Sequence, residues 1–284
     1  MVVVVPGCAL GARPIQTFRA ARAPYSPRVA KPDYIELGEK KHLVRLPIVY
    51  EDRSVIAIDK PQGWMLVPFS WQRTGRNLQA AITSSIAGGD FWAHSRNLKF
   101  LRHVHRLDAD TTGLLLFARS PGGVDSYGEL FESRRMRKTY LAVVHGVPRE
   151  PEWICQLKLA PNSAAIGSMR VDERGGKEAE TSFRLVRSAG RTSLIEAHPL
   201  TGRTHQIRVH LRAAGLPIVG DPLYGDPAKD TGLNWDRRTF PLALRAVALE
   251  YTDPFTRRPV RIRAATDRFL DTFGFGATAA TSES

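Results

Sequence analysis

A cluster of ionisable side chains directly precedes an apolar run in the middle of the chain. Residues 103–113 contain two histidines, two aspartates and an arginine, and residues 114–117 are typical of a buried strand. A rigid strand can present such side chains at a cleft, where they can transfer protons or bind a ligand. The alternative is a polar turn that Asp108 and Thr111 merely cap.

A metal site is the second interpretation of the same residues. His103 and His105 form a His-x-His pair, and on a strand both rings would point to one face, as metal ligands require. A hydrolytic metal site also needs further clustered histidines and carboxylates. His205 and His210 are five residues apart, which is unfavourable for one helix face, and no acidic residue adjoins them. We therefore expect no metal.

Two further stretches contain side chains that could do chemistry. Residues 137–146 are typical of a strand, in which Tyr140 would ordinarily belong to the core. Residues 200–211 lead into an expected helix that buries Ile207 and Leu211 on one face. That core does not explain the density of polar residues beside it, which are Arg203, His205, Gln206 and Arg208.

These three stretches, in this order, resemble the RluA-type family of pseudouridine synthases. The similar motifs are His-Arg-Leu-Asp-x-x-Thr-x-Gly-Leu-Leu-Leu-Phe at 105–117, Lys-x-Tyr-x-Ala-x-x-x-Gly at 138–146 and Thr-Gly-Arg-x-His-Gln-Ile-Arg-x-His-Leu at 201–211. Shorter motifs at 59–63 and 220–225 extend the resemblance over residues 48–265. His-Arg-Leu-Asp alone is a weak signal, whereas five ordered motifs at plausible spacing are a specific one.

The resemblance implies that the uridine glycosidic bond is cleaved, the base rotates, and a carbon–carbon bond forms through C5, with no cofactor. It assigns the catalytic carboxylate to Asp108, acting either as a nucleophile or as a base on the ribose. Asp110 is the second choice. Arg208 matches the ion-pair partner that keeps a buried carboxylate charged. Tyr140 matches the tyrosine that stacks on the base and assists proton removal.

The resemblance also implies an RNA partner, either rRNA or tRNA, whose single-stranded loops offer splayed bases. The target base must leave its stack before a carboxylate can reach it. Arg106 is expected to fill the vacated space, or alternatively to contact a phosphate. Residues expected to contact the RNA or the base are His105, Arg106, Arg203, His205, Gln206, Ile207 and Lys60.

The chain departs from the family pattern at several positions. Thr112 replaces a commoner serine and keeps the hydroxyl, and no histidine precedes Pro68. Arg245 stands where the family often has histidine. We expect Trp64 and Arg245 to reshape the rim that faces the RNA.

Composition is compatible with this function. Lysine and arginine outnumber aspartate and glutamate by 41 to 28, which gives a net charge of +13 and a pI near 10.2 and favours a polyanionic partner. Two cysteines exclude a disulfide framework and a four-cysteine zinc site. There is no Gly-rich phosphate loop after a strand and no apolar run long enough for a bilayer. We expect a cytoplasmic monomer with no nucleotide cofactor and no membrane partner.

The apolar patterning predicts an α+β fold with a mixed, mainly antiparallel sheet and flanking helices. Helices are expected over residues 124–131 and 205–214. The expected strands are 54–59, 114–117, 140–145, a hairpin of 181–187 with 192–197, 242–251 and 260–263.

The expected organisation has three parts. Residues 1–44 are basic and read as a flexible arm, or alternatively as a transit peptide. Residues 45–272 form the catalytic domain, with folded sequence starting near Ile48, and residues 273–284 form a disordered tail. No separate N-terminal RNA-binding domain is recognisable.

Overall fold

The computed structural model describes residues 30–38, 43–66 and 76–276. Most of the expected N-terminal arm and the end of the expected tail, residues 1–29 and 277–284, lie outside the described residues.

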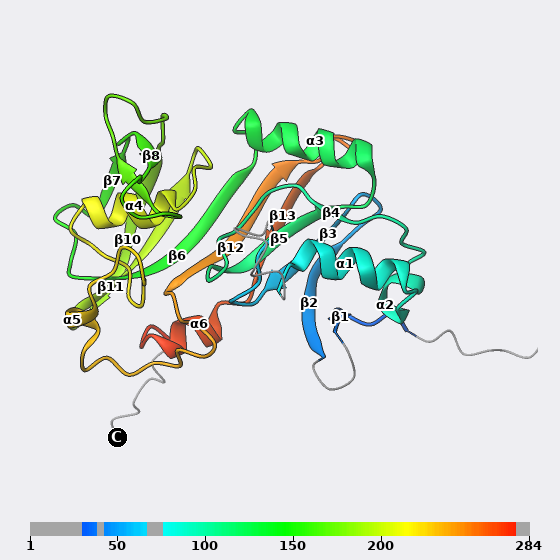
Figure 1. The fold of residues 1–284 in the computed structure, drawn as a ribbon, viewed down its shortest axis with the longest axis horizontal. Coiled ribbons are helices and arrows are strands. Elements are labelled where there is room, and N and C mark those ends of the chain that lie inside the picture. The colour runs from blue at the N-terminus through cyan, green and yellow to red at the C-terminus, as the bar shows by residue number, and fades with distance from the viewer. Residues whose placement is uncertain (1–29, 39–42, 67–75, 277–284) are drawn as a thin grey trace, which may run out of the picture. The chain divides into compact units, whose positions relative to one another are not determined.

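One large sheet dominates the described part of the chain (Figure 1). Its strands follow the order β1-β2-β3-β5-β12-β6-β11-β10-β7, with β4 paired to β5 and β13 paired to β12. Their bounds are β1 Tyr34–Leu37, β2 Val44–Glu51, β3 Val55–Lys60, β4 Arg102–His103, β5 Thr112–Ala118, β6 Arg137–His145, β7 Glu152–Cys155, β10 Thr181–Ala189, β11 Thr192–Pro199, β12 Leu244–Thr252 and β13 Pro259–Arg263.

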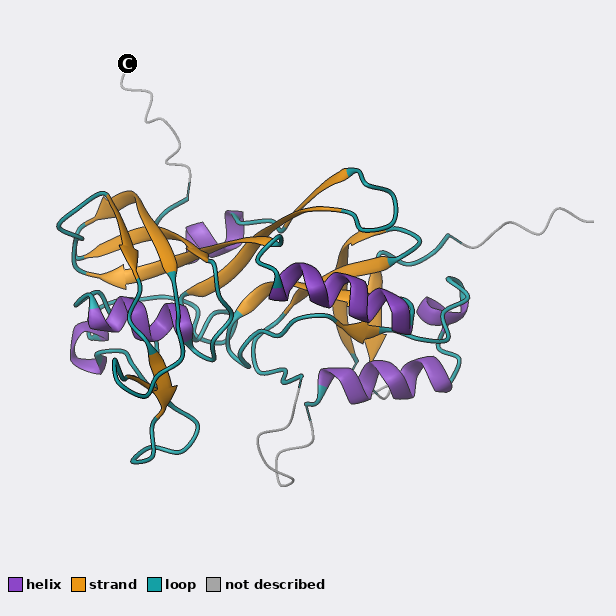
Figure 2. Ribbon diagram, turned by 90° about the horizontal axis from the view of Figure 1, so that it is seen from above, coloured by secondary structure: helices purple, strands orange, loops and turns teal. Residues whose placement is uncertain are grey.

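The sheet is mixed but mainly antiparallel, which confirms the expected fold class. Every pairing between its named strands is antiparallel except that of β12 with β5, which is parallel and joins the two halves of the sheet. The expected hairpin is confirmed, since β10 pairs with β11 across a bulge. A separate two-stranded sheet of β8 (Leu159–Pro161) and β9 (Met169–Val171) projects beside the large one (Figure 2).

Two apolar cores pack against the sheet. The first surrounds β3 and β5, whose side chains are almost all buried, and it includes Leu107, Trp92 and Tyr127. The second surrounds β6, β11 and the start of β12, and it includes Ile207 and Phe269. Near-continuous burial along β5 agrees with a strand that is covered on both faces.

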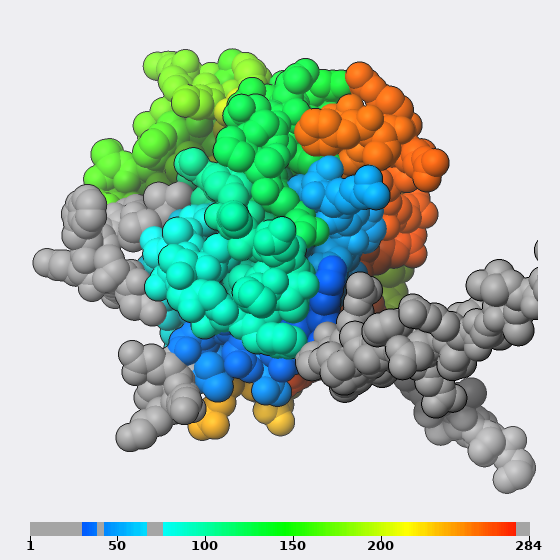
Figure 3. Space-filling model, turned by 90° about the vertical axis from the view of Figure 1, so that its right-hand side faces the viewer, coloured from blue at the N-terminus to red at the C-terminus, as the bar shows by residue number. Residues whose placement is uncertain are grey.

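Short helices cover these cores. Asn77 caps α1 and Ser120 caps α3 by accepting a hydrogen bond from a backbone N–H of the first turn. Figure 3 shows the residues of α1 and α2, in cyan, over the end of the molecule that carries β1. The helices are α1 Leu78–Ala87, α2 Phe91–His94, α3 Pro121–Glu132, α4 Gln206–Ala213, α5 Pro227–Asp230 and α6 Asp267–Thr272.

The expected start of the folded sequence near Ile48 is wrong. Strand β1 begins at Tyr34, and it places Ile35 and Leu37 in the first core with 0% and 1% of their surface exposed. The alternation of polar and apolar residues in β1 spans only four positions beside a basic segment, so its pattern is weak. Pairing with β2 supplies the stabilisation that the local sequence lacks.

Candidate active site

The three polar stretches of the sequence, within residues 103–113, 137–146 and 200–211, meet at one cavity of about 250 Å³. The loop between β4 and β5 supplies one wall, strand β6 supplies the floor, and the segment that leads into α4 supplies the opposite wall. The lining residues are 104–108, Thr111, Phe131, Lys138, Tyr140, 199, 201–208 and Leu244.

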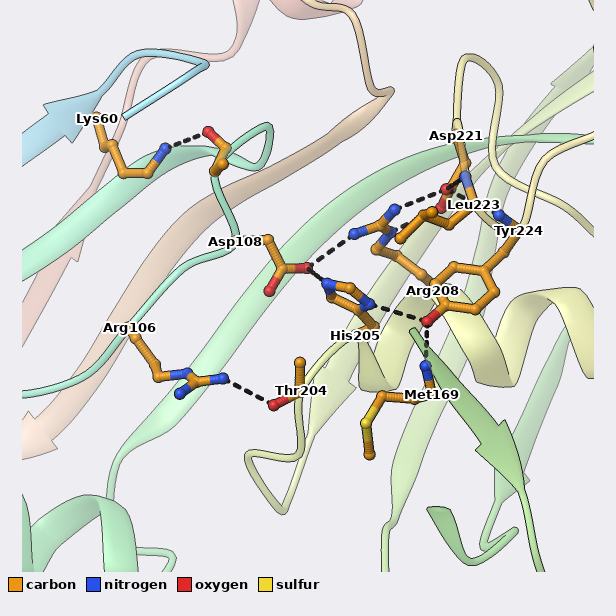
Figure 4. A network of polar contacts seen from close by, with 11 residues as sticks. Lys60, Arg106, Asp108, Met169, Thr204, His205, Arg208, Asp221, Leu223 and Tyr224 are labelled. Carbon is orange, nitrogen blue, oxygen red and sulfur yellow. Dashed lines mark hydrogen bonds and ion pairs between the residues drawn. The ribbon is translucent and has the colours of Figure 1, made fainter. Parts of the chain in front are cut away.

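Asp108 lies in the first wall and keeps 22% of its side chain exposed. Its Oδ2 is 3.3 Å from Nη1 of Arg208 and 3.8 Å from Nε2 of His205 (Figure 4). The contact joins residues that are one hundred positions apart in sequence. It also joins the two cores, because Leu107 packs in the first and Ile207 in the second.

Arg208 is anchored mainly by a second carboxylate, that of Asp221. Its Nε and Nη2 donate hydrogen bonds of 2.7 Å to the two oxygens of Asp221, which is fully buried. Burial alone would lower the pKa of Arg208, but the hydrogen bonds and the charges of Asp221 and Asp108 raise it above its usual value. Burial would raise the pKa of Asp221, and the same ion pair holds it below its usual range.

Tyr140 reaches the cavity from β6 and packs between the two cores. Burial, followed by the nearby charge of Asp108, raises the pKa of its hydroxyl above the usual value. The phenol is therefore protonated at neutral pH. A protonated phenol beside a flipped base can stack on the ring and donate a hydrogen bond.

Lys60 supports the loop between β4 and β5, although it does not line the cavity itself. Its buried ammonium donates hydrogen bonds to the carbonyl oxygens of Ala109, at 2.7 Å, and Pro61, at 2.9 Å. Burial lowers its pKa to about 7, although the charges of Asp110 and Asp108 oppose this shift. Lys60, which the resemblance implies contacts RNA, thereby holds Ala109, the residue after Asp108, in place.

Gly113 fixes where the loop enters β5. Its φ is +106°, and a Cβ there would lie 2.0 Å from the carbonyl oxygen of Ala246. Only glycine allows β5 to approach β12 this closely. The start of β5 is thus locked onto the centre of the sheet.

The other expected RNA-contact residues divide into two groups. Arg106 and Arg203 are accessible at the cavity wall, where Arg106 donates to Oγ1 of Thr204 and Arg203 donates to the carbonyl of Glu178. Ile207 lines the cavity and is 6% exposed, so it serves the core and the cavity together. These positions are compatible with the expected contacts.

Gln206 and His105 are engaged within the protein. The amide of Gln206 accepts from Thr201 and Arg203 and donates to Glu180 and Thr181, which uses all four of its hydrogen-bonding positions. Nε2 of His105 accepts the backbone N–H of Leu116, and its ring stacks on Phe131. Burial lowers the pKa of His105 to about 3, so the ring is neutral.

The expectation that Arg245 reshapes the RNA-facing rim is wrong. Its side chain is 6% exposed and forms an ion pair with Asp59, with a shortest distance of 2.6 Å, and it also donates to the carbonyl of Ala265. An unpaired arginine inside the sheet would be costly, and Asp59 compensates its charge. Trp64 packs against the first core and does not line the cavity.

The sequence interpretation gave no role to several residues at this site. Asp221 and Tyr224 belong to the motif at 220–225, whose residues were given no individual role. Tyr224 contacts His205. Lys138 belongs to the motif at 138–146, lines the cavity and donates to the carbonyl of Thr201. Burial lowers the pKa of Lys138 to about 8.

The rings of His103 and His105 both bond to protein groups. Nδ1 of His103 is 2.8 Å from Oε1 of Gln79, and His105 is occupied by Leu116. Across residues 30–38, 43–66 and 76–276, no three His, Cys, Asp or Glu side chains gather as a metal site would need.

No helix in that part of the chain has the length and apolar character to cross a bilayer.

Residues 54–213 match the family model described as RNA pseudouridylate synthase. The chain is 35% identical to the ribosomal large subunit pseudouridine synthase C of Escherichia coli over 232 residues, which cover 78% of this chain and 67% of that protein. It is 37% identical to the mitochondrial tRNA pseudouridine(32) synthase of Saccharomyces cerevisiae over 185 residues, covering 64% of this chain. That match spans only 37% of the yeast protein.

Two solved human structures have similar folds. RNA Pseudouridylate Synthase Domain Containing 4 aligns with a TM-score of 0.61 at 24% identity, over 80% of this chain and 92% of that one. RNA Pseudouridylate Synthase Domain Containing 1 aligns with a TM-score of 0.58 at 25% identity, over 78% and 83%.

Proposed function

The chain belongs to the RNA pseudouridylate synthase family, and on this premise we propose that it isomerises specific uridines of rRNA or tRNA to pseudouridine, with Asp108 as the catalytic carboxylate. The relatives are named for both RNA classes, so both are candidate substrates. RNA is the partner, and the basic charge of the chain favours its approach.

The observation that carries the proposal is the contact between Asp108 and Arg208 across the cavity. A carboxylate next to a flipped base loses hydration and would tend to take up a proton. The guanidinium of Arg208 offsets this lost hydration by pairing with the carboxylate. Asp108 therefore stays available to attack or deprotonate the ribose while the N1–C1′ bond breaks.

The remaining steps use the side chains around Asp108. Tyr140 stacks on the detached uracil as it rotates, and C5 then bonds to C1′. The hydrogen on C5 leaves as a proton and N1 gains one, so the product is an isomer of the substrate. Arg106, exposed at the wall, occupies the space that the flipped base leaves in the RNA.

Release of tritium from RNA labelled at uridine C5 tests this proposal. The wild type should release tritium from an rRNA or tRNA transcript, and Asp108→Asn should reduce release to background without loss of fold. Asp110→Asn is the matched control, because Asp110 is two residues away but does not line the cavity. Full activity in Asp108→Asn, or no release by the wild type from either RNA class, would refute the proposal.

The target uridine follows from a second measurement. Pseudouridine mapping of total RNA from cells with and without the gene should show at least one uridine that loses its modification. An unchanged map would mean that the cellular RNA pool lacks a target.

A further inference from the structure

The hydroxyl of Tyr224 lies between a backbone donor and a histidine. The backbone N–H of Met169 donates to this oxygen over 2.6 Å, and Nδ1 of His205 lies 2.9 Å from it on the other side (Figure 4). An N–H can only donate, so the Tyr224 oxygen is the acceptor from Met169. Its single hydroxyl hydrogen is then free for Nδ1 of His205.

This arrangement favours one of the two tautomers of His205, because it offers Nδ1 a hydroxyl donor. If Nδ1 accepts from Tyr224, a neutral imidazole has its hydrogen on Nε2. Nε2 is the atom that lies 3.8 Å from Oδ2 of Asp108. The other tautomer would turn a lone pair toward the carboxylate, which is electrostatically unfavourable. Burial lowers the pKa of His205, and although the charge of Asp108 opposes this shift, the pKa stays below its usual value, in agreement with a neutral ring.

Asp108 shares its arginine partner with another carboxylate. Arg208 directs its two shortest hydrogen bonds to Asp221 and approaches Asp108 only at 3.3 Å. One guanidinium thus serves two carboxylates. A neutral N–H on the same side adds a second stabilising dipole without a further charge.

The backbone of His205 is held in an uncommon conformation. It precedes α4 with φ +54° and ψ +19°, in the left-handed region, and its side chain makes no capping hydrogen bond. Non-glycine residues in this region are uncommon and collect at functional sites. Here the conformation directs the ring toward the cavity, between Tyr224 and Asp108.

We propose that Tyr224 and His205 form a positioning pair that holds an Nε2–H next to Asp108 and orients this carboxylate. The inference rests on the proposed function, because it concerns the carboxylate that function assigns. Tyr224 acts through His205, and His205 acts through Asp108.

Nitrogen-15 NMR of the histidine rings tests the tautomer without any activity measurement. The full chain, labelled at histidine, should show His205 neutral and protonated at Nε2 at pH 7. Tyr224→Phe should shift its ring signals toward the Nδ1–H form. Tyr127→Phe is the control, since the Tyr127 hydroxyl bonds to Asp253 away from this cavity. A wild-type imidazolium or an Nδ1–H ring would overturn the inference, whatever the enzyme does.

Two substitutions of His205 then separate a positioning role from a structural one. The amide nitrogen of glutamine can occupy the place of Nε2, whereas asparagine reaches only the place of Nδ1. Asparagine, however, tolerates the left-handed conformation better. We expect His205→Asn to lower kcat about 10-fold to 100-fold, and His205→Gln to retain more activity, with similar KM in both. The opposite order would show a structural role.

His210→Gln, within the helix that His205 precedes, is the matched control. His210 is fully buried, its ring bonds to Thr181 and the carbonyl of Leu157, and it does not line the cavity. This variant should lose thermal stability but keep its kcat per folded molecule. If it lowers kcat as much as His205→Asn does, the effect is a general one of the helix and the proposed pair is refuted.

Discussion

Arg208 makes both of its shortest side-chain contacts with Asp221, at 2.7 Å each, and this pair is almost completely buried. The bidentate geometry fixes the plane of the guanidinium. Its remaining nitrogen, Nη1, is thereby directed at Asp108. Asp221, which does not line the cavity, therefore sets the position of the cation that Asp108 contacts most closely.

Removing this anchor should damage both fold and activity. Asp221→Ala leaves the buried charge of Arg208 without its main partner, which should lower the free energy of unfolding by about 3–5 kcal/mol. Urea denaturation measures this loss, and tritium release should fall with it. Asp226→Asn, at a more exposed site nearby, is the control and should change neither quantity by much. An unchanged stability of Asp221→Ala would contradict the anchoring role.

Gly113 should tolerate no side chain. In Gly113→Ala the new Cβ meets the backbone of Ala246 in a conformation that favours glycine, so unfolding should become easier by about 2–5 kcal/mol. Gly128→Ala is the matched control within α3, where a Cβ meets nothing within 4 Å. It should stabilise the protein by about 0.5–1 kcal/mol. Thermal denaturation of both variants measures the two changes in stability. Equal changes in Gly113→Ala and Gly128→Ala would contradict the close approach of β5 to β12.

Acid should destabilise the protein through His105. Its pKa is about 3 in the folded chain and about 6.5 when unfolded, so between these values only the unfolded state binds a proton there. The free energy of unfolding therefore falls as pH drops below 6.5, by up to about 1.4 kcal/mol per pH unit. His105→Gln removes this dependence. Denaturation at pH 6.5, 5.5 and 4.5 gives the free energy of unfolding of the wild type and of His105→Gln. If both fall equally with pH, the ring of His105 does not have the lowered pKa.

The hydroxyl of Tyr140 should matter for chemistry more than for binding. Tyr140→Phe keeps the ring that we propose to stack on the base but removes the protonated oxygen near Asp108. We expect kcat to fall by about 10-fold or more while the affinity for RNA stays within a factor of two. Single-turnover kinetics with a labelled transcript separates the two quantities. A variant as fast as the wild type would exclude a role of the hydroxyl in proton transfer.

The central strands could be predicted from the sequence because their signals are local. The apolar run of β5 and the hairpin of β10 and β11 carry their own turn residues and periodicity. Strand β1 and helix α1 could not be identified, because tertiary packing stabilises them. Helix α1, for example, buries Leu78 and Ile82 with little apolar patterning elsewhere along its length.

The site residues that belong to a motif could be predicted from the sequence. The residues that hold them in place from distant parts of the sequence could not. The approach of Asp108 to Arg208 agrees with the expectation that the resemblance gave. No local pattern indicates that Lys60 holds the carbonyl of Ala109, 49 residues away. Nor does the sequence reveal that Asp59 neutralises Arg245, since that pair exists only once β3 and β12 enter one sheet.

The active site depends on how the two cores are placed relative to each other. Its carboxylate is carried by the core around β3 and β5, and its guanidinium by the core around β6 and β11. A small displacement of one core relative to the other, with the sheet that they share still intact, would separate the two charges. Catalysis should therefore fail at lower denaturant concentrations than those that melt the sheet.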